Sequence, residues 1–319
     1  MERSEHISRR LKLRQLEVLI AVARRGNMAK AAEELAITQP VVSKTIADLE
    51  DTLGVRLFDR DRRGVQLTLY GKALLDRSVA LFNDLRSGVT ELQFLSDPTA
   101  GELRIGSSDA VASGMLAAII SRLSRRHPQL SYEVTLGGGL TDLQHRELQA
   151  RSLDLVIGRL PNSVPDDLDA EALYYDSFFV LTGTQNAWAR HRKIKLGALI
   201  NEPWCLPSLE SHPWTLIKDA FRTAGLGLPR RIVTARSVQL LISLVETGFF
   251  FTMLPRTVVH FHKGVSSLKV WPADLPIQPY PVGIVTLKGR TLNPVTQVFI
   301  ECAREIARPL AKPNKKAPR

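Results

Sequence analysis

The sequence has few of the features expected of exported or membrane proteins. Its only two cysteines, Cys205 and Cys302, lie far apart and cannot build a disulfide framework or a cysteine-based zinc site. No stretch approaches the roughly 18 apolar residues of a membrane span, and no uninterrupted apolar segment of the signal-peptide kind precedes Arg24. We therefore expect a cytoplasmic protein that does not contact a membrane.

Motifs of catalysis are missing as well. The sequence contains no GxSxG, GxxxxGK[ST], GxGxxG or HExxH pattern, and Gly137-Gly138-Gly139 lacks the later spacing of a dinucleotide loop. None of the seven histidines has a paired carboxylate at a useful spacing. Asp154 begins an apolar strand, which favours a structural role. We predict no enzymatic activity, no catalytic residue, no bound metal and no cofactor.

The composition is that of a folded chain with a basic excess. With 319 residues, 44% of them hydrophobic, the chain is long enough for about two domains. Its 43 Lys and Arg residues outnumber 32 Asp and Glu residues, giving a net charge of +11, which suggests a polyanionic partner. Residues 308–319 alone carry five basic and no acidic residues. A DNA-binding claim must therefore rest on motif geometry and not on total charge.

Three successive helices are predicted near the N-terminus. Apolar residues recur at helical spacing from Leu13 until Arg24-Arg25-Gly26, where basic residues and a glycine mark a helix end. Asn27 can cap a short helix that reaches about Ala36. Thr38 can cap a third helix that continues to about Leu53. The pattern of a short helix, a tight turn and a further helix indicates a helix-turn-helix.

The third helix has two different faces. Its aliphatic residues fall on one side, which predicts a buried face. Small, polar and basic residues near its start form the opposite stripe, which suits a reader of the major groove. The candidate DNA-contacting residues are Thr38, Gln39, Pro40, Ser43 and Lys44. Gln39 can pair with adenine, Lys44 with guanine or phosphate, and Ser43 with either; for Thr38 and Pro40 a purely helix-starting role is an equal alternative.

Two short strands are predicted after this helix. Residues 54–60 and 64–68 flank the charged turn Asp61-Arg62-Arg63, as in the wing of a winged helix-turn-helix. Arg60, Arg62 and Arg63 can lie along phosphates or enter the minor groove. Solvated turn charges are the alternative for this cluster.

The string AAEELAITQPVVSKTIADLEDTLGVRLFDRDRRGVQLTLYG carries a family resemblance. It is similar, nearly position by position, to the winged helix-turn-helix signature of the LysR-type transcriptional regulators. Paired alanines, Gln-Pro, Val-Ser, Leu-Glu, Leu-Gly, Leu-Phe-x-Arg and Leu-Thr-x-x-Gly all occur at the family's spacing. One departure is Lys44, where arginine is frequent, because lysine cannot form the bidentate contact of arginine with guanine. The resemblance implies a DNA-binding domain over residues 1–67.

A long helix is predicted over residues 68–97, since no proline intervenes before Pro98. Heptads from Gly71 give a seam that combines leucines with small residues, which favours a dimerising linker helix. The seam residues are Gly71, Leu74, Ser78, Leu81, Leu85, Gly88, Leu92 and Leu95. In LysR-type proteins this helix pairs two subunits; packing on its own chain is the alternative.

Beyond the turn-rich segment 96–101, short β-rich runs alternate with helical patterns. This alternation predicts an α/β fold with a parallel sheet covered by helices. The family resemblance implies a two-lobed effector-binding domain over residues 98–308, similar to periplasmic solute-binding proteins. We expect lobe I to hold about 98–170 and 276–308, and lobe II about 171–275. The basic segment 309–319 is predicted to be a disordered tail.

Serines at predicted strand ends and helix starts indicate where a ligand binds. Ser107 and Ser108 lie where a strand ends and a helix begins, so hydroxyl groups, N–H groups and the positive helix end converge. By position in the family, Thr135, Gly137, Ser208, Ser237 and Val238 complete the cleft. Simple helix capping is the alternative for each serine. Phe250 stands where the family usually has glycine and can narrow or reshape the cleft.

Taken together, the sequence predicts a sequence-specific transcriptional regulator whose activity is modulated by a small molecule. The resemblance implies double-stranded operator or promoter DNA, a homodimer or homotetramer and RNA polymerase as partners. The effector can be an organic or aromatic acid or a sugar. A solute-binding receptor and an enzyme with an accessory DNA-binding module are the alternatives; the DNA-binding motif opposes the first, and the missing catalytic constellation opposes the second.

Overall fold

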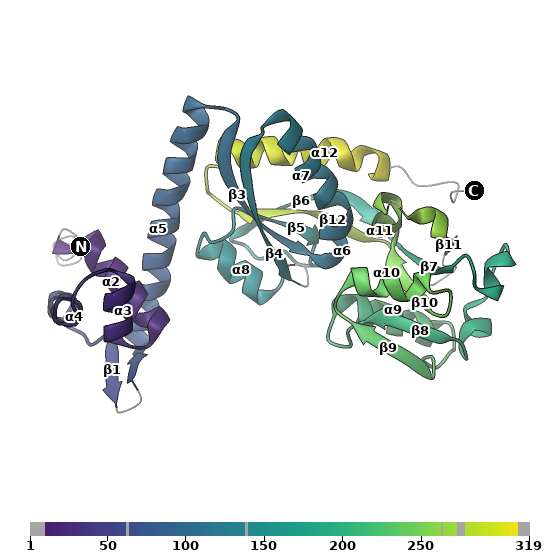
Figure 1. Ribbon diagram of the computed structural model, residues 1–319, viewed down its shortest axis with the longest axis horizontal. Helices are drawn as coiled ribbons and strands as arrows, with labels where there is room; N and C mark the ends of the chain where they lie inside the picture. The colour runs from purple at the N-terminus through teal and green to yellow at the C-terminus, as the bar shows by residue number, and fades with distance from the viewer. Residues whose placement is uncertain (1–9, 62–63, 138–139, 263, 273–277, 312–319) are drawn as a thin grey trace. The chain divides into compact units, whose positions relative to one another are not determined.

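The computed structural model describes residues 10–61, 64–137, 140–262, 264–272 and 278–311 (Figure 1). The chain divides into two compact units. The first comprises the described residues up to Gly88 together with Gln149–Ser152, and the second comprises the rest. Across the described helices, none is long and apolar enough to cross a membrane.

The first unit begins with the predicted three helices followed by a hairpin. Their bounds are α2 (Leu13–Arg25), α3 (Met28–Glu34), α4 (Gln39–Leu53), β1 (Phe58–Asp61) and β2 (Gly64–Leu67). Gly26 ends α2 in the left-handed conformation, with φ 61°, which explains the glycine at that position. The apolar faces of the three helices bury one another in a single cluster that also takes in Leu57 and Phe58. This core fixes α4 with one face inward.

The long helix α5 (Leu69–Ser96) differs in part from its predicted seam. Gly71 and Ser78 are buried within the first unit, and a Cβ on Gly71 would collide with the carbonyl oxygen of Leu57. The glycine is therefore needed for close packing within the chain. For this end of α5 the structure thus agrees with the alternative that the helix packs on its own chain. The leucines of the second half, from Leu81 to Leu95, are exposed.

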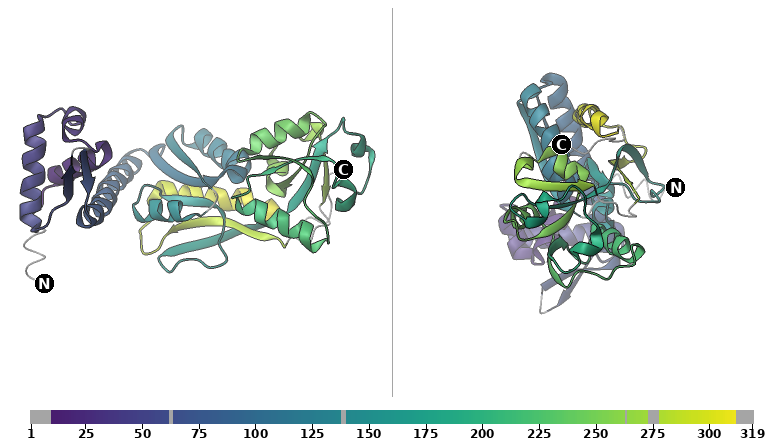
Figure 2. Two further views of the ribbon diagram at one scale, coloured as in Figure 1. Left: turned by 90° about the horizontal axis from the view of Figure 1, so that it is seen from below. Right: turned by 90° about the vertical axis from the view of Figure 1, so that its right-hand side faces the viewer.

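Lobe I of the second unit is a five-stranded sheet in the order β4-β3-β5-β12-β6. Its elements are β3 (Ala100–Ser108), α6 (Asp109–Val111), a π-helical turn (Ala112–Leu116), α7 (Ala117–Arg126), β4 (Gln129–Gly137), α8 (Asp142–Gln149), β5 (Leu155–Arg159), β6 (Leu168–Asp176), β12 (Tyr280–Leu287) and α12 (Pro294–Ala311). Helices α7 and α12 pack together against one face of this sheet (Figure 2). Alternation along β5 places Ile157 in that core and Val156 in a smaller cluster on the other face.

Lobe II is a second five-stranded sheet, in the order β11-β7-β10-β8-β9. Its elements are β7 (Phe178–Gly183), β8 (Pro203–Pro207), α9 (His212–Thr223), β9 (Arg231–Ala235), α10 (Val238–Glu246), β10 (Phe251–Pro255), α11 (Arg256–Phe261), β11 (Leu268–Pro272) and short 3₁₀ turns at Ala187–Arg190, Leu196–Leu199 and Val265–Ser267. Trp204 and Phe221 of α9 belong to one core, whereas Cys205 packs with α10 and α11 in another. Both cysteines are free and buried, and burial raises the pKa of the Cys205 thiol to about 12.

The α/β class is confirmed, but the expectation of a parallel sheet is wrong in part because both sheets are mixed. Strand β12 pairs antiparallel with β5 and β6, and β7 pairs antiparallel with β10 and β11. Strand β6 continues to Asp176 and stays paired with β12, so the chain leaves lobe I later than residue 170. Helix α12 likewise continues to Ala311, three residues past the predicted boundary at 308.

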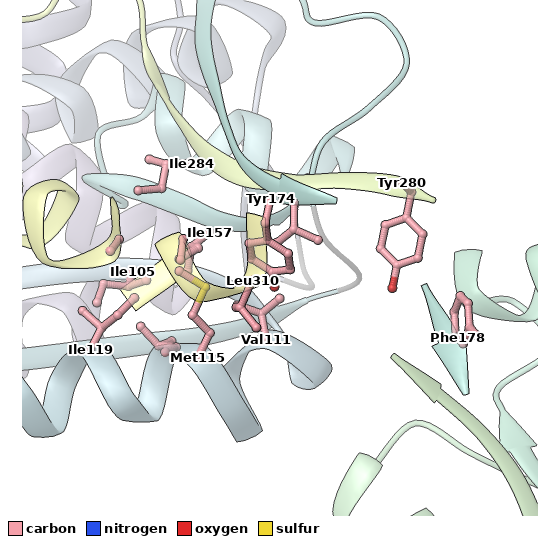
Figure 3. Close-up of a cluster of buried hydrophobic side chains, with 14 of the residues drawn as sticks. Ile105, Val111, Met115, Ile119, Ile157, Tyr174, Phe178, Tyr280, Ile284 and Leu310 are labelled. Atoms are coloured by element: carbon pink, nitrogen blue, oxygen red, sulfur yellow. The ribbon is translucent and has the colours of Figure 1, made fainter. Parts of the chain in front are cut away.

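Aromatic contacts join the two lobes where the chain crosses between them. Phe178 of β7 and Tyr280 of β12 have ring centroids 5.7 Å apart and planes tilted by 45°, and Figure 3 shows the two side chains next to each other. Both belong to the apolar cluster that extends from Ile105 in lobe I to Trp204 in lobe II. The crossing is thus a packed apolar contact with a cavity beside it.

Candidate DNA-binding surface and ligand cavity

The predicted recognition stripe lies on the surface of α4. Thr38, Gln39, Pro40 and Lys44 are exposed, and Ser43 is half-buried. On the opposite face the side chains of Val42, Ile46 and Leu49 are completely buried. The structure thus gathers all five predicted residues at one end of one helix.

Only one of the two predicted helix caps forms. The Asn27 side chain accepts hydrogen bonds from the N–H groups of Ala29 at 2.8 Å and Lys30 at 3.1 Å. Thr38 has the extended backbone of a capping residue, but its side chain makes no capping hydrogen bond. The start of α4 therefore does not use the Thr38 hydroxyl, which favours the recognition alternative for this residue.

Val41 belongs to the same surface and was missed by the sequence analysis. It is 49% exposed although it is apolar, while its neighbour Val42 is buried. Val42 continues the buried stripe of Ile46 and Leu49, so helical periodicity turns its neighbour Val41 away from the centre of that stripe, and this was the available signal. An exposed aliphatic group beside Gln39 and Ser43 has the chemistry to contact a thymine methyl group.

The wing is held firmly against the helices. The Glu50 carboxylate of α4 accepts hydrogen bonds from the backbone N–H groups of Leu57 at 2.7 Å and Phe58 at 3.1 Å. Arg60 pairs with Val65 in the β1–β2 ladder, but the Arg60 side chain and the whole of Arg62 and Arg63 lie outside the described residues. The base of the wing is fixed, and its predicted arginine contacts stay a prediction.

A cavity of about 660 Å³ lies between the two lobes of the second unit. Its walls come from the carboxyl ends of strands and from the starts of helices in both lobes. Lining residues from lobe I are Ser108, Asp109, Ala110, Val111, Leu136, Gly137, Thr141, Arg159, Asp176, Tyr280 and Val282. Lining residues from lobe II are Phe178, Pro207, Ser208, Glu210, Ser211, His212, Pro213, Leu216, Ala235, Arg236, Ser237, Val238, Leu254, Pro255 and Thr257.

Five of the eight predicted effector residues line this cavity, and three do not. Ser108, Gly137, Ser208, Ser237 and Val238 are brought together. The Ser107 side chain is completely buried, and its hydroxyl donates to the carbonyl oxygen of Ile157 at 3.1 Å. Thr135 lies on β4 without lining the cavity, and Phe250 packs against the apolar cluster around α10. Phe250 is not among the residues that line the cavity, because its side chain packs toward the lobe II core.

The cavity serines also have structural partners. Ser108 accepts a hydrogen bond from the N–H of Val111 at 3.4 Å, and Ser237 accepts one from the N–H of Leu240 at 3.2 Å. Ser211, which the sequence analysis missed, caps α9 in the same way. These contacts agree with the alternative that the serines cap helices. The starts of α6, α9 and α10 therefore all lie at the wall of one cavity.

Charged side chains of the cavity wall were missed entirely by the sequence analysis. They are Asp109, Arg159, Asp176, Glu210 and Arg236. Asp109 of lobe I accepts a hydrogen bond of 2.5 Å from the backbone N–H of Val238, the first residue of α10 in lobe II. A carboxylate placed at a helix start is stabilised by the unpaired N–H groups there. This contact links the two lobes directly.

Asp176 is the most buried of these acids. It accepts hydrogen bonds from the Thr257 hydroxyl at 2.5 Å and from the Ser177 N–H at 2.9 Å. Burial nevertheless raises the pKa of this carboxyl, and the donors from Thr257 and Ser177 oppose that rise. Asp176 lines the cavity at the point where the chain crosses between the lobes.

The predicted structural role of Asp154 agrees with its contacts. Asp154 and Arg104 are both buried and form an ion pair at 3.0 Å, reinforced by hydrogen bonds to backbone and side chain. Arg290 lies 3.5 Å from the same carboxylate. In the described part of the chain, no three His, Cys, Asp or Glu side chains are grouped so that they could hold a metal ion.

Comparison with known proteins assigns both units. The family model of the bacterial regulatory helix-turn-helix protein, lysR family, matches residues 13–72, and the model of the LysR substrate binding domain matches residues 96–308. The chain belongs to the LysR family. It is a LysR-type transcriptional regulator with a helix-turn-helix DNA-binding domain and an effector-binding domain.

Named relatives of this LysR-family regulator are transcriptional regulators over nearly their whole length. The chain is 28% identical over 301 residues to the HTH-type transcriptional regulator GbpR of Azospirillum brasilense, covering 92% of this chain and 86% of that protein. It is 28% identical over 300 residues to the HTH-type transcriptional regulator TdcA of Escherichia coli (strain K12), covering 92% of this chain and 93% of that protein.

Solved full-length structures share the fold. A full-length cysteine variant of OxyR from Pseudomonas aeruginosa has a TM-score of 0.65 at 22% identity and covers 97% of this chain and 99% of its own. Full-length CbnR complexed with its target DNA has a TM-score of 0.67 at 20% identity and covers 93% of this chain and 100% of its own. At these identities the likeness concerns the fold alone.

Proposed function

We propose that this LysR-family regulator reads operator DNA through the exposed start of α4 and responds to a small molecule in the cavity between the lobes. The observation that carries the proposal is the clustering of Gln39, Ser43 and Lys44 on one exposed helix end. Thr38, Pro40 and the wing residues Arg60, Arg62 and Arg63 add contacts to the DNA backbone. Because the partner is chromosomal DNA, the chain works in the cytoplasm.

The exposed half of α5 supports a homodimer within this proposal. Leu85, Leu92 and Leu95 are 47%, 66% and 66% exposed and recur on one face of the helix. A second copy of α5 would cover this face and set the spacing of two recognition helices. Two such dimers would form the homotetramer.

The cavity supports the effector half of the proposal. Ser108, Gly137, Ser208, Ser237 and Val238 would contact the bound molecule, whereas Ser107 would position the β3 end from behind. Binding would shift the population of lobe arrangements, and through it DNA bending and the access of RNA polymerase. In this account the chain has no catalytic role; turnover abolished by a single substitution in the cavity would contradict it.

The DNA half is tested with the full-length protein and DNA fragments that it selects from a random-sequence pool. Lys44→Ala should weaken binding to the selected DNA by about tenfold or more, because a base contact is lost. Lys193→Ala removes the same charge from an exposed position in lobe II and serves as the matched control. Its affinity for the selected DNA should change by less than about twofold. Mobility-shift titrations at one fixed salt concentration measure both.

Either of two results would contradict the proposed function. The first is that no DNA sequence is enriched by the wild-type chain. The second is that Lys44→Ala and Lys193→Ala weaken binding equally, since this would mean that charge and not position determines affinity.

A further inference from the structure

The three acidic side chains in the cavity wall are each already engaged. Asp109 accepts from the N–H of Val238, and Asp176 accepts from the Thr257 hydroxyl. Glu210 is paired with Arg236 at 2.5 Å. The negative charges of the wall are therefore held by the protein's own donors, and none of them requires a ligand cation.

Arg159 is the exception among the charged groups. Its Nη1 atom is buried, and no described residue places an acceptor within hydrogen-bond distance of it. Its guanidinium carbon lies 5.0 Å from the centre of the Tyr280 ring, a contact that stabilises a cation but does not neutralise it. Burial lowers the pKa of Arg159, as expected for a cation without a counter-charge. Arg159 as a whole is half-buried, but a guanidinium with a buried, unpartnered nitrogen favours an anionic partner.

The sheet register explains why Arg159 points into the cavity. Arg159, the last residue of β5, stands opposite Val282 of β12. Tyr280 lies two residues before Val282 and therefore on the same face of the sheet. All three residues line the cavity. The carboxyl end of β5 thus presents one cation beside an aromatic ring and an aliphatic side chain.

The start of α10, one of the helix starts in the cavity wall, is already occupied by an anion. The start of α10, where N–H groups would otherwise attract a ligand carboxylate, holds the carboxylate of Asp109. An incoming anion would have to displace Asp109, whereas at Arg159 it meets no competing carboxylate from the wall. The two positions therefore have opposite preferences for an anion.

We infer that the effector is an organic acid whose carboxylate pairs with Arg159 and whose apolar body lies against Tyr280, Phe178 and Val282. This inference rests on the proposed function, because it names the ligand class of the same cavity. Val111, Leu216 and Leu254 extend the apolar wall around it, and Figure 3 shows Val111, Phe178 and Tyr280. Asp109 acts as a built-in occupant of the α10 start and directs the carboxylate to Arg159.

The test uses matched acid and amide probes on the full-length chain. The acids are benzoate, 3-phenylpropanoate and hexanoate, and each is paired with its uncharged primary amide of nearly equal shape. At about 10 mM, at least one acid should raise the apparent melting temperature, because a ligand that binds only the folded state stabilises it. Its amide should not. This comparison needs no variant.

Variants then locate the charge. Arg159→Met should weaken the binding of the active acid by roughly 30-fold or more in calorimetric titration, because the cationic partner of the carboxylate is removed. Arg159→Lys keeps the charge and should retain part of the affinity. Arg236→Met is the matched control, because Arg236 is also a cavity cation but is exposed and already paired with Glu210; its affinity should change by less than about threefold.

Three results would overturn the inference: an amide that binds as well as its acid, unchanged acid binding in Arg159→Met, or no response to any of the three acids. DNA binding by the same protein samples separates this failure from failure of the proposed function. Wild-type protein that binds selected DNA but ignores acids contradicts only the inference. Protein that binds acids through Arg159 but selects no DNA contradicts only the proposed function.

Discussion

The surface of α4 and the cavity between the lobes are built in opposite ways. The α4 surface takes all its predicted residues from one helical stretch, and a single buried stripe below it fixes their direction. The cavity takes its residues from positions between Ser108 and Val282, on strands and helices of both lobes. The first is therefore determined by local periodicity, and the second by strand register across the whole second unit.

The two regions should also lose stability separately and for different reasons. The winged unit depends on one apolar cluster, whereas lobe I additionally contains the buried Arg104–Asp154 ion pair. All four tryptophans lie in the second unit, at positions 188, 204, 214 and 271, so their fluorescence reports on that unit alone. This gives a direct way to separate the two.

The largest effect is expected from Asp154→Ala. It leaves Arg104 buried without its carboxylate, which should cost about 3–5 kcal/mol of unfolding free energy. Urea unfolding followed by tryptophan fluorescence measures this loss. Asp169→Ala, an exposed aspartate on β6, is the control and should change stability by less than about 0.5 kcal/mol. Equal effects of the two substitutions would mean that the ion pair does not stabilise lobe I.

A somewhat smaller effect is expected from Ile46→Ala in the winged unit. Ile46 is completely buried, and its truncation should cost about 2–5 kcal/mol. The variant should lose helical circular dichroism and DNA binding at lower temperature while tryptophan emission stays unchanged. Val41→Ala on the exposed side of the same helix is the control for stability. A parallel shift of tryptophan emission would show that the two units unfold as one.

The smallest effect separates the two helix caps. Asn27→Ala removes a side chain that accepts two backbone hydrogen bonds and should cost about 1 kcal/mol. Thr38→Ala removes no capping bond and should change stability by less than about 0.5 kcal/mol, while it weakens DNA binding. Thermal unfolding and mobility shifts on both variants measure the difference. If Thr38→Ala is as destabilising as Asn27→Ala, the assignment of Thr38 to recognition fails.

These differences follow what the sequence could and could not predict. Helical spacing was enough for α2, α3 and α4 and for the direction of Gln39 and Lys44, because each helix carries its own pattern. It was not enough for the buried Ser78 or for Gly71, which packs against Leu57 and Leu67 of the neighbouring hairpin segment. Single-helix periodicity does not distinguish packing on the same chain from packing on a second copy.

In the second unit the sequence predicted the ends of strands better than it predicted which distant segments contact each other. Ser108 was found because serine at a helix start is a local signal, and Ser237 was found from the same signal together with its position in the family. Asp109 and Arg159 were missed because their partners in the cavity wall, Val238 and Tyr280, are distant along the chain. The sequence also could not show that Phe250 packs against the lobe II cluster, since that contact depends on elements distant along the chain.

The end of α12 has a practical consequence for handling the protein. Leu310 is buried, and its carbonyl oxygen accepts a hydrogen bond of 2.6 Å from Arg256 of lobe II. Truncation at the predicted tail boundary, residue 309, would remove this anchor, whereas truncation after Ala311 would spare it and still delete four cations. A purification tag or fluorescent label attached after Ala311 would be joined to an anchored part of the fold.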